Sequence, residues 1–433
     1  MGSVPMRFLF VSYEGLIADT AWQVTKEGHE ARMWISEAGA PDIGDGFVPK
    51  SKDWRKDVPW ADVVVFDDVL GGMGAMADEV RAAGKPVIGG SPYTDRLEED
   101  RAFGQEELKA AGVSIIPQEN FTSFDDAVAY VRANPTRYVL KPSGEAQNDK
   151  RLLFVGEEED GRDVIQVLQD YKRYLADTVK EFQLQRRIVG VEVAVGAFFN
   201  GKEFVTPVCV NFEHKKLFPG DIGPPTGEMG TTMFWSGPNR LFNATLKKME
   251  GRLAQARYAG SMDINCIVNS NGIYPLEFTA RFGYPAITIQ QEGLLTPMGE
   301  LLQGLADGTL AKLRARSGFQ VGVRVVVPPF PYADKATFES TSKDSVILFK
   351  TPGREGIHIE EVRRVGEEWR VAGNSGVVLV VCGTGPTMKQ AQRQAYNRVR
   401  NVMIPYMYYR DDIGERWSED SDRLHAWGYL RES

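Results

Sequence analysis

Residues 213–230 read EHKKLFPGDIGPPTGEMG and form the most distinctive segment of the chain. The segment combines a histidine, two consecutive lysines and an aspartate with closely spaced glycines and prolines. Glycine has no side chain beyond its α-carbon, so it lets the backbone approach a bound molecule closely. The segment is also longer than a typical connection between strands. It is therefore a candidate functional loop, with a flexible linker as the alternative interpretation.

The patterns around this loop predict an α+β central region, residues 95–312. LQRRIVG and VEVAVGAFFNGKEFVTPVCV, together residues 184–210, predict strands with a turn at Gly190 and a hairpin signal at Asn200-Gly201. DINCIV and IYPLEF predict a strand pair around an Asn271-Gly272 turn. Helices are predicted over residues 99–112, 125–133, 162–179, 239–258 and 296–306.

An alternation of apolar strands and helical stretches predicts an α/β domain over residues 6–94. Strands that alternate with helices form a parallel sheet with crossover helices. The predicted strands are RFLFVS at 7–12, ARMWIS at 31–36, ADVVVF at 61–66 and KPVIGG at 85–90.

Strand-like runs from Gly318 onward predict a small, mostly antiparallel β domain over residues 318–416. The runs are VGVRVVV, SVILFK, HIEEVRRV, EWRVAG and VVLVVCG, followed by a helix at 387–402. The acidic residues 417–433 are predicted to be a surface extension.

The composition bounds the class of protein. With 433 residues, the chain is long enough for several domains. Its net charge of −8 and pI near 5.4 argue against a general nucleic-acid or membrane-surface binder. Cys209, Cys266 and Cys382 are far apart, which predicts neither a disulfide framework nor a metal cluster. No apolar run approaches the roughly 20 residues that span a bilayer. We therefore expect a soluble protein in a reducing, cytoplasmic setting.

Two segments are candidates for nucleotide binding. Lys141 closes the apolar strand RYVLK before Pro-Ser-Gly, where an ammonium and backbone N–H groups can hold a phosphate. Gln185 and neighbouring backbone can pair with a purine edge, and Glu192 can accept hydrogen bonds from a ribose diol. A solvated lysine and an ordinary hairpin with exposed polar residues are the alternatives.

Two carboxylates on the predicted strand pair are candidates for metal binding. Asp263 and Glu277 are expected to face one another across the pair, and they would repel each other unless a cation lay between them. Mg²⁺ shared with phosphates suits that position. Arg281 follows at a turn where an oxyanion could be held. Surface acids on a hairpin are the alternative interpretation.

These segments resemble the phosphoribosylamine–glycine ligase (glycinamide ribonucleotide synthetase) family of the ATP-grasp superfamily. The loop at 213–230 is similar to the family's DHKR followed by GDxGPNTGGMG. LEFTARFGYPA at 276–286 corresponds to IEFNCRFGDPE. KQAQRQAY at 389–396 and YRDDIGER at 409–416 correspond to AEAQKRAY and CRKDIGWR. The resemblance runs from about residue 90 to residue 416 and is weaker before that.

The resemblance implies a Rossmann-like N-terminal domain, a central ATP-grasp unit with a smaller lid at about 132–192, and a C-terminal domain. It implies an ADP-forming carbon–nitrogen ligase that uses ATP with Mg²⁺ or Mn²⁺. Such an enzyme activates a glycine-like amino acid as an acyl phosphate and joins it to an amine, as in purine biosynthesis. The expected partners are small molecules, and the expected state is a monomer or dimer.

The resemblance also implies roles for residues at matching positions. These are Arg101, Lys141, Gln185, Arg186, Ile188 and Glu192 around ATP; Glu277, Asp263 and Thr279 at the metal; Lys141, Arg281 and Asp221 in catalysis; and His214, Lys215, Asp221, Gly223, Thr226, Gly227 and Arg281 at the substrates.

The chain departs from the family pattern at some of these positions. Thr279 replaces an asparagine that would bind the metal, and Arg101 replaces a lysine. The loop SGEAQNDK at 143–150 is poor in the glycines usual for a phosphate-covering loop. A non-catalytic nucleotide-binding relative is therefore one alternative.

The first loop departs most. SYEGLIADTAW at 12–22 replaces a GGREHAL-like loop that suits a substrate phosphate, and it brings Glu14 and Asp19. A phosphate would meet negative charge there, unless Lys50, Lys52 or Arg55 supplied a second site. The same ligase chemistry on a different amino acid and amine pair is therefore a second alternative.

Overall fold

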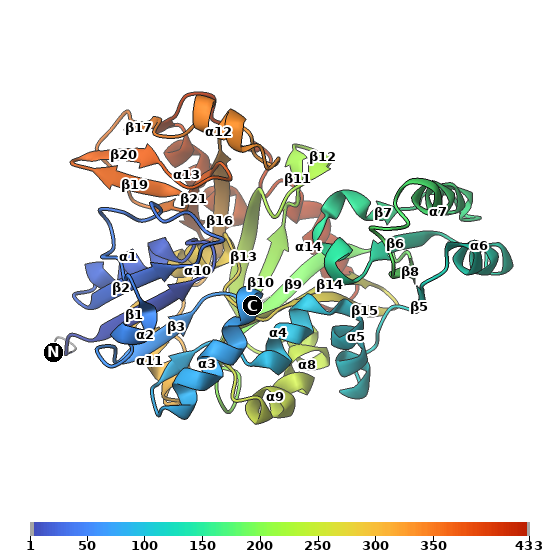
Figure 1. Ribbon diagram of the computed structural model, residues 1–433, viewed down its shortest axis with the longest axis horizontal. Coiled ribbons are helices and arrows are strands. Elements are labelled where there is room, and N and C mark those ends of the chain that lie inside the picture. The colour runs from blue at the N-terminus through green and yellow to red at the C-terminus, as the bar shows by residue number, and fades with distance from the viewer. Residues whose placement is uncertain (1–3, 431–433) are drawn as a thin grey trace.

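The computed structural model describes residues 4–430, apart from the side chains of residues 145, 148 and 150 (Figure 1). Its N-terminal part is a four-stranded parallel sheet in the order β2-β1-β3-β4, as predicted. The strands VVVF and FLFVS are buried, because helices cover the sheet. The elements are β1 Arg7–Ser12, α1 Ala18–Lys26, β2 Glu30–Ile35, α2 Trp54–Asp57, β3 Val63–Phe66, α3 Met73–Ala82 and β4 Val87–Ile88.

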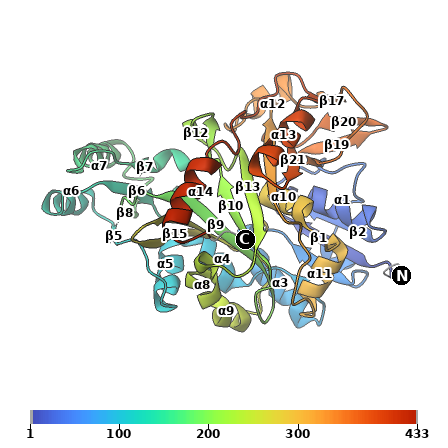
Figure 2. The same ribbon diagram turned by 180° about the vertical axis from the view of Figure 1, so that it is seen from behind.

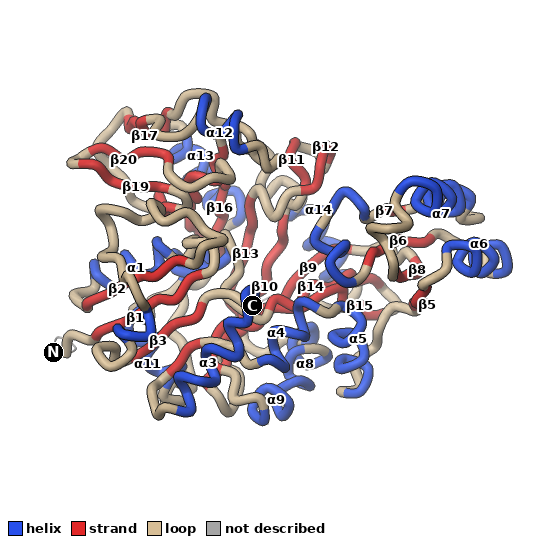
Figure 3. The backbone as a smooth tube through the Cα atoms, viewed as in Figure 1, coloured by secondary structure: helices blue, strands red, loops and turns tan. Residues whose placement is uncertain are grey.

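An eight-stranded antiparallel sheet runs through the centre of the molecule (Figure 3). Its order is β15-β14-β9-β10-β13-β16-β21-β18. The last three strands come from the predicted third domain, so part of that domain continues the central sheet. The strands are β9 Val191–Asn200, β10 Val208–Glu213, β13 Gly230–Ser236, β14 Ala259–Asn269, β15 Gly272–Thr279, β16 Phe319–Val326, β18 Ile357–Ile359 and β21 Val377–Gly385.

The central sheet has one apolar face at the β9–β14 end. Successive side chains of a strand point to opposite faces, and Val193, Val195 and Phe199 share the apolar one. They pack against α9 Leu246–Gln255 and α14 Trp417–Ala426. Seen from behind, α14 lies across these strands (Figure 2). The apolar core therefore leaves the opposite face of β9, β10 and β14 for polar side chains.

The C-terminal helix α14 corrects the prediction of a surface extension after residue 416. Leu424 and Tyr429 are buried in the core of the central sheet, while Asp422 and Arg423 face solvent. The acids Glu419 and Asp422 lie on the outer face of the helix, whereas Asp420 is buried and binds Arg416. Residues 431–433 of the predicted extension lie outside the described residues.

The lid is a second, smaller sheet of order β5-β8-β6-β7 that projects from the body (Figure 1). It starts at β5, earlier than the predicted residue 132, because QENF has no apolar run to signal a strand. Glu192, placed in the lid by the prediction, belongs to the central sheet. The lid elements are β5 Gln118–Phe121, α6 Phe124–Ala133, β6 Tyr138–Pro142, β7 Phe154–Val155, α7 Arg162–Tyr174 and β8 Phe182–Arg186.

A third small sheet, of order β19-β20-β17-β22, completes the C-terminal part. The predicted single strand HIEEVRRV is two strands, because β18 joins the central sheet and β19 joins this one. The elements are α12 Lys335–Thr341, β17 Val346–Phe349, β19 Val362–Val365, β20 Glu368–Val371, α13 Met388–Val399 and β22 Val402–Met403.

The remaining helices connect these parts. The predicted helix at 99–112 corresponds to α5 Arg101–Ala110, which Asp100 caps, and a further helix, α4 Pro92–Glu99, precedes it. The helix predicted at 239–258 is also split, into α8 Arg240–Ala244 and α9. Helices α10 Ala286–Gly293 and α11 Met298–Ala306 lie between the N-terminal and central sheets. No helix in residues 4–430 is long and apolar enough to cross a membrane.

Candidate active site

Polar side chains gather on the face of the central sheet that the core leaves open. The cross-strand register aligns Asn265 of β14 with Ala194 of β9 and Asn211 of β10. With the two-residue period of a strand, this register puts Glu192, Glu213 and Asp263 on that same face. The alternation of the strands thus collects acids and amides that are far apart in sequence.

Lys215 lies at the centre of this polar face. Its Nζ atom is 2.8 Å from Glu192 Oε1, 3.2 Å from Glu213 Oε2 and 3.6 Å from Glu277 Oε1. Asn265 Nδ2 donates to both Glu192 and Glu213 at 3.0 Å. Burial lowers the pKa of Lys215, but the three carboxylates outweigh burial and hold that pKa well above its usual value. Glu213 and Asn265 were not predicted as site residues.

Two further cations face the same carboxylates. Arg101 Nη2 lies 4.0 Å from Glu277 Oε2, and Arg101 Nη1 donates to the carbonyl of Pro142 at 3.3 Å. Lys141, on the adjoining lid strand, is only 7 % exposed. Burial and the nearby Arg101 lower the pKa of Lys141 to about 7. Within the described part of the chain, the Lys141 ammonium makes no hydrogen bond or ion pair. A buried ammonium without a partner is costly, so this site is built for an anion.

Asp263 and Glu277 do not face each other directly, which corrects the prediction. The register pairs Asp263 with Thr279 and Glu277 with Asn265, and the bulge between Asn265 and Cys266 brings Glu277 to the same face as Asp263. Asp263 Oδ2 accepts from Asn211 Nδ2 at 2.8 Å and fills the space that Gly196 leaves open. Burial and the nearby Glu213 raise the pKa of Asp263 to about 7. The two acids are diagonal neighbours on one face.

The lid turns its own polar face toward this region. Lys141 pairs in register with Gln183, and Val139 pairs with Gln185, so these side chains share one face of the lid. Gln185 Nε2 donates to Gln118 Oε1 at 3.3 Å. Both amide atoms of the fully buried Gln183 lack a hydrogen-bond partner. Arg186, the last residue of β8, is exposed, and Ile188 is half-buried in the connection from the lid to β9.

The loop at 213–230 folds into a hairpin of β11 Lys216–Phe218 and β12 Ile222–Pro225. Gly223 has a φ of +85°, and a Cβ there would lie 2.4 Å from the ring of Phe218. Thr226 Oγ1 donates to the carbonyl of Lys215 at 2.8 Å. Gly227 lies beside the buried guanidinium of Arg324. Gly223 and Thr226 therefore maintain the hairpin's shape.

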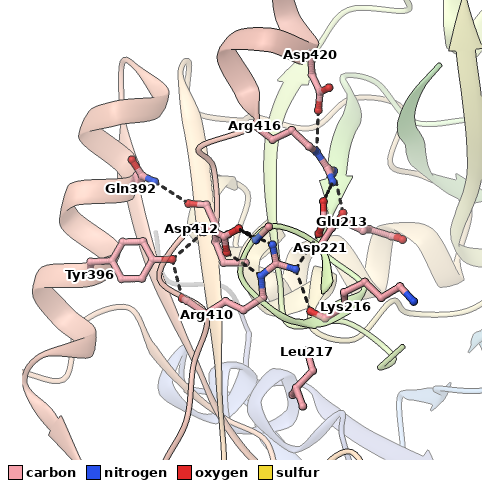
Figure 4. A network of polar contacts seen from close by, with 12 residues as sticks. Glu213, Lys216, Leu217, Asp221, Gln392, Tyr396, Arg410, Asp412, Arg416 and Asp420 are labelled. Atoms are coloured by element: carbon pink, nitrogen blue, oxygen red, sulfur yellow. Dashed lines mark hydrogen bonds and ion pairs between the residues drawn. The ribbon is translucent and has the colours of Figure 1, made fainter. Parts of the chain in front are cut away.

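Asp221 and His214 are placed differently from their predicted roles. Asp221 sits at the hairpin turn, where its carboxylate binds Arg410 at 2.8 Å and Arg416 at 2.7 Å (Figure 4). A carboxylate shared by two guanidinium groups is occupied, so Asp221 is not available for the catalytic role that the resemblance implies. His214 is 2 % exposed and neither ring nitrogen has a partner. Burial and the nearby Arg416 and Arg410 lower its pKa to about 4, so the ring is neutral.

Arg281 is held by an acid that was not predicted. Its Nε atom lies 3.1 Å from Glu98 Oε1, and its Nη1 donates to the carbonyl of Phe282 at 2.9 Å. The backbone N–H of Ala280 donates to the same Glu98 carboxylate at 2.7 Å. The guanidinium is thus fixed at the turn after β15, partly exposed and close to the polar face.

A buried acid from the end of β3 binds the first loop, at the place where the family loop suits a phosphate. Asp67, at the end of β3, accepts from Ser12 Oγ at 2.5 Å, from the Tyr13 N–H at 3.0 Å and from Tyr284 Oη at 3.0 Å. Burial and the adjacent Asp68 raise the pKa of Asp67 to about 7. Glu14 is exposed at the rim of this loop.

Asp19, and the cations Lys50 and Arg55 that could have supplied a second phosphate site, already bind other groups. Asp19 is buried and binds His358 Nδ1 at 2.8 Å, so it does not face a ligand, contrary to the prediction. Lys50 donates to the carbonyl of Pro41 at 2.7 Å and lies 3.2 Å from Asp45. Arg55 lies 3.5 Å from Glu79 on the surface. Lys50 and Arg55 thus already have acidic partners.

The residues present fit ATP with a divalent cation. Gln183 has two unsatisfied amide atoms on the strand opposite Lys141, and Lys141 lies near Arg101, which suits phosphates. In the described residues, no group of three or more His, Cys, Asp or Glu side chains is arranged to hold a metal alone. Mg²⁺ bound to a nucleotide needs only one or two carboxylates, because phosphates and water supply its other ligands. Glu277 and Asp263 suffice for that.

Comparisons with known proteins agree with this arrangement. Residues 99–287 match the family model "Phosphoribosylglycinamide synthetase, ATP-grasp (A) domain", and residues 338–416 match "Phosphoribosylglycinamide synthetase, C domain". The phosphoribosylamine–glycine ligase of Streptomyces coelicolor is 28% identical, over 82% of this chain and 84% of the relative. That of Mycobacterium leprae is 27% identical, over 93% of each.

Solved structures show the same fold. The phosphoribosylamine–glycine ligase of Thermotoga maritima has a TM-score of 0.70 and 22% identity, covering 94% of this chain and 100% of that one. The N5-carboxyaminoimidazole synthetase of Staphylococcus aureus has a TM-score of 0.55 and 12% identity, covering 91% and 97%.

Proposed function

The chain belongs to the phosphoribosylglycinamide synthetase family, and from that premise we propose that it is an ADP-forming carbon–nitrogen ligase. One observation carries the proposal. The buried Lys141 ammonium makes no direct hydrogen bond or ion pair with the described residues, although Glu277 and Glu192 attract it electrostatically, and it lies at the junction of the lid with a carboxylate-lined sheet. A triphosphate with its cation satisfies both halves of that junction, since it offers negative charge to Lys141 and positive charge to the carboxylates.

The proposed nucleotide site uses both sheets. Lys141 and Arg101 bind the phosphates, and the mostly buried Gln185 lies on the lid face that would meet the adenine, with Arg186 and Ile188 in the adjoining connection. Glu192 accepts hydrogen bonds from the ribose. It is available for this role because its present partners, Lys215 and Asn265, hold the carboxylate in place from one side.

Glu277 is the proposed main metal ligand. Asp263 is the second, and the hydroxyl of Thr279, a weaker ligand, lies directly across from it in the register. A bound Mg²⁺ or Mn²⁺ would neutralise charge on the phosphoryl group during its transfer. Arg101 and Lys215 already bracket the Glu277 carboxylate, so they fix where it points.

The proposed reaction has two steps. A carboxylate oxygen of the acid substrate attacks the γ-phosphorus of ATP, which breaks the bond to the bridging oxygen and releases ADP. The amine then attacks the acyl carbon, loses a proton and displaces inorganic phosphate. Arg281, fixed by Glu98, is the proposed holder of the substrate's oxyanion.

Glycine and phosphoribosylamine are the first substrates to test, because the named relatives are phosphoribosylamine–glycine ligases. The proposed partners are therefore small molecules, in a cytoplasmic enzyme of purine biosynthesis. Lys215, Gly227 and Thr226 lie on the segment that would meet these substrates.

A different amine is the second candidate, and the first loop favours it. Glu14 and the Asp67–Asp68 pair lie where a phosphate of the amine substrate would need positive charge. Two like charges a few ångströms apart cost on the order of 1 to 4 kcal/mol at surface dielectrics. Such a cost weakens the binding of a phosphorylated amine roughly ten- to a thousandfold.

Isotope transfer tests the chemistry. With ¹⁸O in the substrate carboxylate, the label is expected in the released phosphate, because the carboxylate oxygen leaves with phosphorus. Release of AMP and pyrophosphate would refute an acyl phosphate. No turnover of ATP with any pair of acids and amines would favour the non-catalytic relative.

Product formation tests the amine. Phosphoribosylamine is generated in situ from ribose 5-phosphate and ammonia and supplied with glycine and Mg-ATP. Efficient formation of glycinamide ribonucleotide supports the purine-pathway substrates. ADP release with other amines but not with this one supports the second candidate.

A further inference from the structure

The segment that carries Lys215 is held from behind by two arginines of the C-terminal part of the chain. Arg416 Nη2 donates to the carbonyl of Glu213 at 3.1 Å, and Arg410 Nη1 donates to the carbonyl of Lys216 at 2.9 Å. The two contacts, on Glu213 and Lys216, are seen from close by in Figure 4, and in sequence they flank His214 and Lys215. Both guanidinium groups then meet on the carboxylate of Asp221.

This cluster is rigid by its own geometry. Arg410 is 1 % exposed in its side chain and makes a two-bond contact to Asp412, with both distances 2.7 Å. Asp412 also accepts from the Gly220 N–H at 2.9 Å, and Arg416 binds Asp420 at 3.0 Å. A planar guanidinium that makes several hydrogen bonds has little freedom to move. The hairpin and residues 410–420 are therefore one unit.

His214 fits this unit only as a neutral ring. It lies between Lys215 and the arginines, and a positive charge there would be repelled by both guanidinium groups. The arginines instead take their negative partners from Asp221, Asp412 and Asp420. The segment 213–216 is thus fixed by bonds to its backbone, while the side chains of Glu213 and Lys215 meet on the polar face of the sheet.

We propose that Arg410 is a positioning residue that acts through Lys215, with Arg416 as its counterpart on the other side. The inference rests on the proposed function, since it concerns the nucleotide site. Lys215 reaches Glu192 and Glu277 from a backbone that Arg410 and Arg416 fix on both sides. A shift of that backbone moves the ammonium relative to the residues proposed to bind ribose and metal. Misplacing a group in an active site by about 1 Å can lower the reaction rate roughly a hundredfold.

A double-mutant cycle on nucleotide binding tests this role. The affinity for ADP with Mg²⁺ is measured by calorimetry for the wild type, Arg410→Lys, Lys215→Met and the double variant. Arg410→Lys keeps the charge and removes the planar fork. We expect it to change the affinity at least tenfold in the wild-type background and less than about threefold when Lys215 is already replaced, because residues that act together are not additive.

The controls separate positioning from loss of structure. Arg398→Lys is the matched control, since Arg398 also binds a backbone carbonyl, that of Cys382 at 2.7 Å, in the same part of the chain. Its effect is expected to be small and the same in both backgrounds. If Arg410→Lys does not fold, by its thermal transition, Asp221→Asn takes its place in the cycle, because Asp221 is more exposed and binds both arginines.

The outcomes are distinct. An equal change of affinity in the two backgrounds, or no change from Arg410→Lys in either, overturns the positioning role and leaves the ligase proposal standing. A wild-type protein that binds no ADP with Mg²⁺ overturns both.

Discussion

Lys215 explains how several acids share one face of the central sheet. Glu192, Glu213 and Glu277 would repel one another, but each has an oxygen within 3.6 Å of the same ammonium. Burial raises the pKa of Glu213, and Lys215 opposes that rise. A bound metal would add positive charge beside the Lys215 ammonium, and the two cations would repel each other. The carboxylate that binds the metal would therefore need its full negative charge to offset that repulsion.

Glu277→Gln tests that requirement at a single residue. The amide keeps the volume of this side chain on strand β15, but it removes the negative charge that faces Lys215 and Arg101 and that is proposed to hold Mg²⁺. We expect turnover to fall roughly a hundredfold or more with the thermal transition unchanged. Glu203→Gln, in the exposed turn after β9, is the control and should keep wild-type rates. Near-normal activity of Glu277→Gln at saturating Mg²⁺ contradicts the metal assignment.

Glu192→Ala tests the ribose contact. A hydrogen bond to a charged group contributes about 1.5 to 3 kcal/mol, so we expect the KM for ATP to rise by roughly ten- to a hundredfold. The kcat should change little, because a ribose contact is made equally in the ground and transition states. Steady-state kinetics over a range of ATP concentrations measure both. If kcat collapses while KM stays constant, Glu192 acts in the chemistry instead.

The strand pair that carries Asp263 and Glu277 could be predicted from the sequence, because strand-like runs flank the Asn271-Gly272 turn. The bulge in that pair and its pairing with β9, which bring Glu192 to the same face, could not be predicted. Glu213, Asn265 and Glu98 were missed for a physical reason. Their importance depends on contacts between elements distant in sequence, such as β14 beside β9 and Arg281 beside α4. No local pattern encodes those neighbours. Asp221 was misjudged because its partners, Arg410 and Arg416, lie about 190 residues later in the chain.

At the scale of elements, strands with apolar runs were predicted well and polar ones were not. The buried strands β1, β3 and β21 fall on the predicted runs RFLFVS, ADVVVF and VVLVVCG. Strand β5, QENF, was missed because its stability comes from pairing with β8 and not from its own composition. The lid therefore begins earlier than the sequence indicates.

Helix α14, whose acidic composition wrongly predicted a surface extension, can be tested for its contribution to stability. Leu424 is 1 % exposed against the apolar face of the central sheet. We expect Leu424→Ala to lower the free energy of unfolding by about 2 to 5 kcal/mol, measured by urea denaturation. Asp422→Ala, on the exposed face of the same helix, should change it by less than about 0.5 kcal/mol. Equal effects of the two changes would mean that the helix does not stabilise the core.

At the scale of the whole molecule, one buried histidine joins three parts of the chain. His358 of β18 binds Asp19 of α1 at 2.8 Å through Nδ1 and Glu292 of α10 at 3.0 Å through Nε2. Asp19 also accepts from the Ile359 N–H at 3.0 Å. Burial alone would lower the pKa of His358, but Asp19 outweighs burial and holds it well above 6.5. The pKa values of Asp19 and Glu292 are lowered by the same contacts.

His358→Gln should therefore destabilise the protein in a pH-dependent way. The contribution of the imidazolium is fully present below its unfolded pKa of 6.5 and is lost as the pH rises through the higher folded pKa. The contribution of the two carboxylates is present above their unfolded pKa values, 3.8 and 4.5, and is lost as the pH falls through their lower folded pKa values.

At pH 6 all three groups are charged, and breaking a buried pair costs about 3 to 5 kcal/mol. Above pH 6.5 we expect the gap between wild type and variant to narrow by up to about 1.4 kcal/mol per pH unit. Unfolding curves from pH 5 to pH 9 measure that gap, with the exposed His425→Gln as a control that should show none. A gap that stays constant across this range means that His358 is neutral in the folded protein and that its charge does not join the three parts.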